Sequence, residues 1–185
     1  WYKKHHRSIE KITSNTVAIC HVHIGGFVSD AALRLAQYCD DHGLFFVEDA
    51  AQAHGSINKG KKAGTLGIAA GFSFYSTKVM TTGEGGIVTT NNKSLVKKMR
   101  SMREFGKEKK GIFINYHTSI GYNWRLSEVC SLMGIYQLNS INKFIKWRTR
   151  IANMYFKHLK NLKNIEIVTP ERKGNNYYKF IILLK

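Results

Sequence analysis

The sequence feature that most constrains the fold is a strand, a helix and a second strand in direct succession between residues 16 and 49. Residues 16–22 are rich in β-branched and apolar types, which predicts a strand. Ser29 predicts a helix N-cap, and apolar residues recur at helical spacing from Ala32 to Cys39. Residues 44–47 (Leu-Phe-Phe-Val) form an unbroken apolar run, typical of a buried parallel strand. Strand, helix and strand make a right-handed βαβ unit, so we predict an α/β fold.

The rest of the chain continues the mixture of strand and helix patterns. We expect helices at residues 93–105 and 126–160. The second pattern contains a weak helix-forming stretch at residues 139–142 (Asn-Ser-Ile-Asn), which predicts two helices or a bend. The remaining strand candidates are residues 72–75, 86–90, 166–168 and 178–184.

The charge distribution limits what the chain is expected to bind. It has 29 Lys and Arg against 12 Asp and Glu, a net charge of +17. Residues 93–185 hold twenty of the basic residues and only five of the acidic ones. Because charges at helical spacing usually form a solvated face, we favour an anionic small molecule over nucleic acid. The rival nucleic-acid module rests on basic residues interleaved with Phe144, Trp147, Tyr155 and Phe156, which a helix core or interface also explains.

Composition also bounds the location of the protein. No apolar run reaches the roughly eighteen residues of a membrane span, so we expect no membrane partner. Three cysteines are scattered without a C-x-x-C pair, which favours free thiols in a reducing, cytoplasmic setting. The chain starts at Trp1 and stops inside an apolar run, and we interpret it as an interior piece of a longer protein.

Two residues stand where α/β proteins gather their ligands, at the carboxyl ends of strands. Asp49 directly follows the buried run at 44–47, and Lys78 follows the strand candidate at 72–75 in a loop of small polar residues. Each has an ordinary interpretation, a loop carboxylate for Asp49 and a solvated surface cation for Lys78. A partly desolvated lysine, however, can attack a carbonyl group and form a Schiff base.

Taken together, the two residues indicate a pyridoxal 5′-phosphate (PLP) site. The lysine can bind the aldehyde, the carboxylate can hold the pyridine nitrogen protonated, and hydroxyls such as Ser73 can take the phosphate. A metal site is not favoured. His21 and His23 could face one side of a strand, but no Cys or carboxylate cluster completes a ligand set, so we expect both to pack at the strand end.

Four motifs, in a fixed order along the chain, indicate a resemblance to a known family. They are residues 48–55 (Glu-Asp-Ala-Ala-Gln-Ala-His-Gly), 72–78 (Phe-Ser-Phe-Tyr-Ser-Thr-Lys), 83–86 (Gly-Glu-Gly-Gly) and 121–128 (Gly-Tyr-Asn-Trp-Arg-Leu-Ser-Glu). With them, residues 15–160 resemble the DegT/StrS family of PLP-dependent nucleotide-sugar aminotransferases. The resemblance implies the PLP-dependent transferase fold type I, with a mostly parallel sheet flanked by helices. It also implies that residues 1–140 are part of the large PLP-binding domain. Residues 141–185 would then be a connecting helix and the start of a small C-terminal domain.

The resemblance also implies roles for residues. Lys78 matches the lysine that binds PLP covalently and then moves the proton, and Asp49 matches the carboxylate paired with the pyridine nitrogen; both are expected to be catalytic. Gln52 matches the residue that bonds the cofactor's 3-hydroxyl, and Ala51 lies where a small side chain packs on the ring. Ser73 matches a phosphate-binding hydroxyl.

Asn123 matches an asparagine that reaches the phosphate across a dimer interface, which implies a homodimer with shared active sites. The activity implied is transfer of an amino group from an amino donor, expected to be glutamate, to a keto group of a nucleotide-linked sugar, for glycan biosynthesis. Dehydratases of the family carry histidine in place of the lysine, so Lys78 favours transamination. A non-catalytic homologue that binds PLP or a sugar nucleotide remains an alternative.

Overall fold

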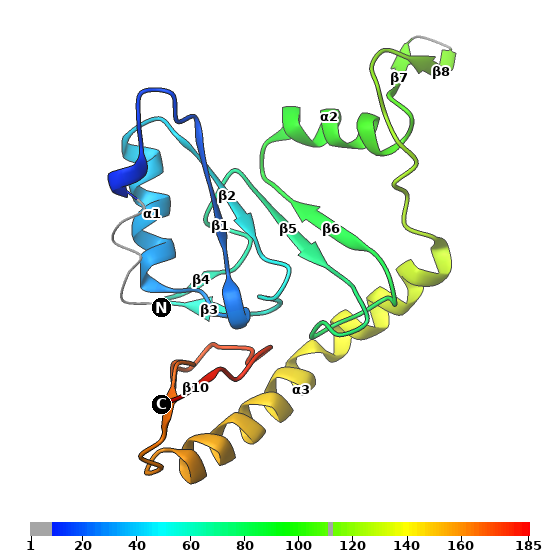
Figure 1. Cartoon of the computed structure of the whole chain (residues 1–185). Helices are drawn as coiled ribbons and strands as arrows, with labels where there is room; N and C mark the ends of the chain where they lie inside the picture. Colours follow the sequence, from blue (N-terminus) through cyan, green and yellow to red (C-terminus); the bar gives the residue numbers. More distant parts are fainter. Residues whose placement is uncertain (1–8, 111–112) are drawn as a thin grey trace.

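The centre of the protein is a four-stranded sheet. The structure, a computed structural model, describes residues 9–110 and 113–185. The strand order is β1 (Ala18–Val22), β2 (Phe45–Asp49), β5 (Ala69–Ser73) and β6 (Gly86–Thr89), as Figure 1 shows. The first three strands are parallel, whereas β6 runs antiparallel to β5. The predicted α/β class and mostly parallel sheet are therefore confirmed.

The first βαβ unit forms as the sequence predicts. Helix α1 (Asp30–Asp41) begins after Ser29, whose Oγ accepts a hydrogen bond from the Ala32 N–H at 3.0 Å. It ends before Gly43, which takes the positive φ of +66° that glycine adopts without strain. Its buried side packs Leu35 and Cys39 against Phe46 of β2. This apolar layer fixes the direction of β2 and so places Asp49 at the carboxyl end of the sheet.

A single 3₁₀ turn, η2 (Ile24–Gly26), follows β1, and a small hairpin of β3 (Ile57–Asn58) and β4 (Lys61–Lys62) follows β2. The strand predicted at residues 72–75 is misplaced, because β5 covers Ala69–Ser73. Pairing starts early, with Val47 opposite Ala69, since the small residues Ala69, Ala70 and Gly71 fit the space between β2 and β6. The strand predicted at residues 86–90 is confirmed as β6.

Helix α2 (Lys93–Arg103) ends two residues earlier than predicted. Phe105 adopts a φ of +59° and Gly106 one of +71°, which a right-handed helix cannot contain. The chain then forms an antiparallel hairpin of β7 (Lys107–Lys110) and β8 (Phe113–His117), which the sequence patterns did not predict.

Helix α3 (Glu128–Leu159) is one continuous helix, so of the two expectations, two helices or a bend, the first is wrong. Packing explains this. Ile141, within the weak stretch, and Ile145, just after it, lie over Gly55, and such tertiary contacts override a low helix propensity. Farther along, Ala152 and Phe156 pack against Tyr177 in a separate apolar cluster. Phe156 is therefore a core residue.

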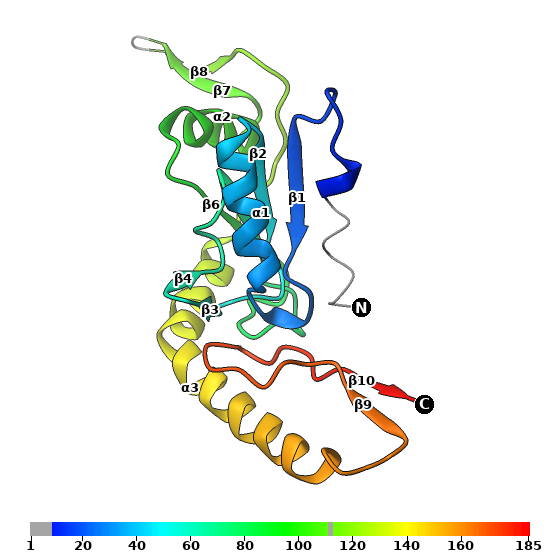
Figure 2. The ribbon, with the colours of Figure 1, turned by 90° about the vertical axis from the view of Figure 1, so that its left-hand side faces the viewer.

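Strands β9 (Ile165–Ile167) and β10 (Ile182–Leu184) pair antiparallel after α3. Figures 1 and 2 show this last segment, in orange and red, lying beyond the carboxyl ends of β1 and β2 and beside α3. Residue 140, the predicted domain boundary, falls within α3, and the division into two domains stays a prediction. Within residues 9–110 and 113–185, no helix is both long and apolar enough to cross a membrane.

Candidate active site

The carboxyl ends of β2 and β5 bring three predicted site residues to one edge of the sheet. Asp49 is the last residue of β2 and pairs in register with Gly71 of β5. Ser73 ends β5 two residues farther on, and Lys78 lies in the loop that follows. The sheet register therefore places Asp49 and Ser73 at the same edge of the sheet, and Lys78 follows in the next loop; their roles as site residues stay a prediction.

The Asp49 carboxylate is held in place by its own loop. Its Oδ1 accepts a hydrogen bond from the Ala51 N–H at 3.0 Å. The Asp49 carbonyl accepts one from the His23 N–H at 3.0 Å, which ties it to the end of β1. Among the described residues, Oδ2 has no hydrogen-bond partner, so one carboxylate oxygen is left to meet a ligand.

The orientation of Gln52 follows from a single backbone contact. Its Oε1 accepts a hydrogen bond from the Gly25 N–H at 2.8 Å. Because an N–H can only donate, the amide must turn its oxygen toward Gly25 and its Nε2 away. Nε2 has no partner within the part of the chain that the structure describes. Gln52 therefore presents a hydrogen-bond donor to any ligand beside Asp49.

Lys78 is half-buried and has an aromatic neighbour. No Asp or Glu of the described ranges lies within 4.0 Å of its Nζ. Instead, Nζ lies 5.0 Å from the centroid of the Tyr178 ring. Nearby, Ser73 Oγ accepts a hydrogen bond from the Tyr75 N–H at 3.2 Å and keeps its own hydroxyl proton to donate.

His54 of the first motif is buried next to this loop. Its ring lies against Phe72 and Phe74, with centroids 5.4 and 6.0 Å away. Burial lowers the pKa of His54 to about 4; the Ser73 backbone opposes this shift, and the positive charge of Lys78 adds to it. The imidazole is thus neutral at physiological pH, which suits a site that already contains one cation.

Asn123 lies apart from the other predicted residues. It is exposed and forms an isolated β-bridge with Glu104 at the end of α2. No contact joins it to Asp49, Gln52 or Lys78 in the described part of the chain. Its predicted role across a dimer interface therefore stays a prediction.

A buried, hydrogen-bonded acid at the end of β2 was missed in the sequence. Glu48 and His23 are each about 1% exposed, and His23 Nε2 lies 2.9 Å from Glu48 Oε2. Glu48 also accepts three backbone N–H groups, from Gly64, Leu66 and Gly67, at 2.7 to 3.0 Å. This acid binds the end of β2 to the following loop. Its position inside an apolar strand was the available signal, because a buried acid needs such partners.

The segment after α3 was missed as well. Asn176 is fully buried, and its Nδ2 donates to the carbonyls of Gln52 at 2.8 Å and His54 at 3.0 Å. Tyr178 places its hydroxyl 3.2 Å from Thr77 Oγ1. No sequence signal foretold these contacts, which join residues more than 100 positions apart.

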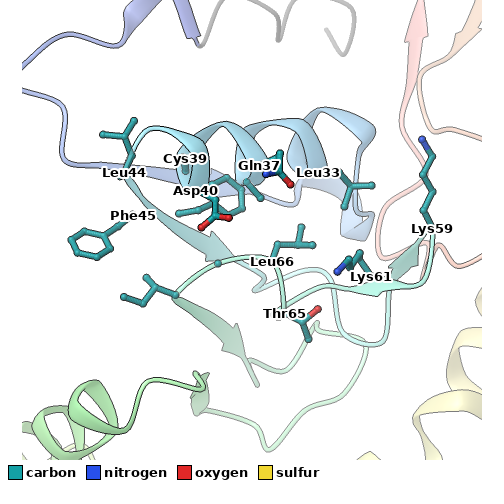
Figure 3. Close-up of a pocket in the computed structure, with 15 residues that line it drawn as sticks. Leu33, Gln37, Cys39, Asp40, Leu44, Phe45, Lys59, Lys61, Thr65 and Leu66 are labelled. Carbon is teal, nitrogen blue, oxygen red and sulfur yellow. The ribbon is translucent and has the colours of Figure 1, made fainter.

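A hollow of about 760 Å³ lies elsewhere, between α1, the start of β2 and the loop near residue 66. Figure 3 shows Leu44 and Phe45 at one end of it and Lys59 and Lys61 at the other. Leu44 and Phe45 lie at the amino end of β2, opposite Asp49. Ligands of open α/β sheets bind at the carboxyl ends of the strands, so this hollow is not at the edge of the sheet where Asp49 lies.

The fold and the strand-end lysine and carboxylate define a class, the PLP-dependent transferases of fold type I. The chain belongs to the DegT/DnrJ/EryC1/StrS aminotransferase family, which matches residues 4–185. It is 36% identical over 159 residues to the GDP-perosamine synthase of Escherichia coli O157:H7. This match covers 84% of this chain and 42% of the synthase.

Solved structures share the fold of this chain. Helicobacter pylori PseC, an aminotransferase involved in the biosynthesis of pseudoaminic acid, has a TM-score of 0.90 and 32% identity; the match covers 96% of this chain and 48% of PseC. The E. coli GDP-4-keto-6-deoxy-D-mannose-3-dehydratase, solved with bound hydrated PLP, shares the fold with a TM-score of 0.88 at 21% identity, over 98% of this chain and 50% of that one. The chain thus spans about half the length of the relatives it matches.

Proposed function

We propose that the protein containing this chain is a PLP-dependent aminotransferase. It transfers an amino group from an amino acid, glutamate in our proposal, to a keto group of a nucleotide-linked sugar. The observation that carries the proposal is the half-buried Lys78, which has no carboxylate partner in the described ranges. It lies in the loop after β5, the strand that pairs with β2, and β2 ends at Asp49, whose Oδ2 is unpaired. The names of the relatives, which include a GDP-perosamine synthase, support the sugar nucleotide as substrate.

The polar atoms left unpaired at the site fit PLP. Asp49 offers one carboxylate oxygen, suited to a protonated pyridine nitrogen. Gln52 offers its Nε2 donor, suited to the 3-oxygen of the cofactor. Ser73 offers a hydroxyl proton, suited to the phosphate. Ala51 adds no bulk beside them.

In this proposal the residues divide the work. When bound, PLP supplies an electron sink for the carbon that bears the amino group. Asp49 keeps the pyridine nitrogen protonated, because its negative charge stabilises the cation. Lys78 binds the aldehyde carbon through Nζ and, once released, carries the proton between substrate atoms. The neutral His54 adds no second positive charge to the site.

We further propose that the protein is a homodimer with shared sites. Asn123 lies in a stretch of exposed apolar side chains around the start of α3, including Ile120, Trp124, Val129 and Leu132, which are 63 to 83% exposed. Exposed apolar patches of this kind mark interaction surfaces. A second copy on this face would bring Asn123 to the partner's cofactor.

The division into a large domain (residues 1–140) and a connecting helix with the start of a small domain (141–185) is part of the proposal. A cytoplasmic location is as well, and the free Cys20, Cys39 and Cys130 support it.

The test is the half-reaction with glutamate in the full-length protein. PLP-loaded protein mixed with glutamate should lose the yellow colour of bound PLP and release 2-oxoglutarate in equal amount. Lys78→Ala should abolish both changes, whereas Lys98→Ala, an exposed lysine on α2, should retain them. Bound PLP that glutamate leaves unchanged would instead support a non-catalytic homologue.

A further inference from the structure

Tyr178 reaches the candidate active site from the far end of the chain. Its ring centroid lies 5.0 Å from Lys78 Nζ, within the range of a cation–π contact. Across the described residues no carboxylate offers Lys78 an ion pair. The ring face is thus the group that attracts the Lys78 ammonium.

The Tyr178 ring is tied to the loop that bears Lys78. Its hydroxyl lies 3.2 Å from Oγ1 of Thr77, the residue just before Lys78. The hydrogen bond with Thr77 also lowers the pKa of Tyr178; burial opposes this shift, and the charges of Lys78 and Lys179 add to it. Movement of the ring relative to Lys78 therefore costs a hydrogen bond as well as the cation–π contact.

The backbone of Tyr178 is fixed just as firmly. Its N–H donates to Asn176 Oδ1 at 2.9 Å, and Asn176 is fully buried among the carbonyls of the loop after Asp49. Gly26 closes the other side: a Cβ there would lie 2.8 Å from Tyr178 Cβ and would clash with Asn176 Oδ1. Three segments thus meet here without room to spare, so Tyr178 cannot drift from Lys78.

One further cation faces the same ring. Lys179 Nζ lies 5.0 Å from its centroid, but this side chain is exposed and its charge is screened by water. Lys78 is half-buried, so its contact with the ring is the less screened of the two.

We propose that Tyr178 is a positioning residue for Lys78: the face of the Tyr178 ring holds the Lys78 amino group in the loop that follows β5. This inference rests on the proposed function for its purpose, since a lysine released from a cofactor must stay close enough to return. The segment after α3 is then part of the active site, although it follows the last family motif by 50 residues.

The test measures Lys78 itself, in full-length protein freed of PLP. An amine-reactive reagent labels the lysines at fixed pH, and peptide mass spectrometry gives the rate at Lys78. Tyr178→Leu removes the ring and should raise this rate about fivefold, the change that corresponds to roughly 1 kcal/mol of cation–π attraction. Tyr178→Phe keeps the ring and should stay within about twofold of the original rate.

Phe180→Leu is the matched control, because Phe180 packs against Phe156 in the same segment without a contact to Lys78. An unchanged rate in Tyr178→Leu, or an equal rise in Phe180→Leu, would overturn the proposal. PLP binding and the glutamate half-reaction are measured on the same samples. If the protein without substitutions neither binds PLP nor reacts with glutamate, but its lysines show the expected labelling rates, the proposed function is refuted and the contact between Tyr178 and Lys78 still holds.

Discussion

The buried Glu48 provides the sharpest test of how the strand end is held. Its carboxylate accepts four hydrogen bonds, one from His23 and three from backbone N–H groups at Gly64, Leu66 and Gly67. Burial raises the pKa of Glu48, but these four donors outweigh it and leave the pKa below its usual value of 4.5. Glu48→Gln keeps the size of the side chain and replaces one acceptor oxygen by a donor.

The magnitude follows from counting donors. The remaining amide oxygen has two lone pairs and can serve two of the four N–H groups. With the oxygen facing Leu66 and Gly67, the NH₂ group faces His23 Nε2 and the Gly64 N–H; the His23 nitrogen can accept from it in its other tautomer, whereas the Gly64 N–H is left unsatisfied at a cost of about 1–3 kcal/mol. We expect Glu48→Gln to lose roughly 1–3 kcal/mol of unfolding free energy, a sizeable share of the 5–15 kcal/mol typical of a folded protein.

The assay is denaturant unfolding of the full-length protein, with Glu84→Gln as control because Glu84 is exposed in the neighbouring loop. The pH dependence adds a second readout. Since the folded-state pKa lies below 4.5, Glu48 stabilises the protein above pH 4.5, and this contribution is lost as the pH falls through the folded value. Glu48→Gln should lack that loss. A cost below about 1 kcal/mol, or one equal to that of Glu84→Gln, would refute the reasoning.

Three further predictions concern the surroundings of the site. The pKa of His54 is about 4 in the folded protein and 6.5 for the free side chain, so the free energy of unfolding should fall by up to about 3 kcal/mol as the pH drops from 6.5 to 4. In His54→Leu, denaturant unfolding should show a smaller decrease over the same pH range. Asp30, bonded to Asn58 and Arg172, has a pKa of about 2; its stabilisation is present above pH 3.8 and lost as the pH falls toward 2. Because its side chain is 38% exposed, Asp30→Asn should cost only about 1 kcal/mol at pH 7, and a loss above 3 kcal/mol would contradict this. Asn176→Ala should weaken PLP binding about tenfold or more, measured by equilibrium dialysis, because the carbonyls of Gln52 and His54 lose their shared donor; unchanged affinity would show that this contact does not support the site.

Local patterns predicted those parts of the fold whose causes are local. Helix α1 lies where the Ser29 cap, the apolar spacing and Gly43 place it. The β5 strand was shifted because its small residues carry no strand signal, and only pairing with β2 reveals them. Helix α3 stayed whole because packing over Gly55 outweighs the weak propensity of its middle.

The site divides in the same way. The positions of Asp49, Ser73 and Lys78 at or just after strand ends could be predicted because the apolar runs before them mark the strands, whereas their roles stay a prediction. Tyr178 and Asn176 could not, since their contacts close a loop of more than 100 residues and depend on the path of α3. Glu48 could have been noticed, because an acid in a buried strand requires partners.

The proposed activity depends on Lys78 as the residue that binds PLP. This is tested by borohydride reduction of the full-length protein in the presence of PLP, followed by mass spectrometry of its peptides. We expect one phosphopyridoxyl group per chain, attached to the peptide that contains Lys78 and absent from Lys78→Ala. Attachment spread over exposed lysines such as Lys98, or no attachment at all, would contradict it.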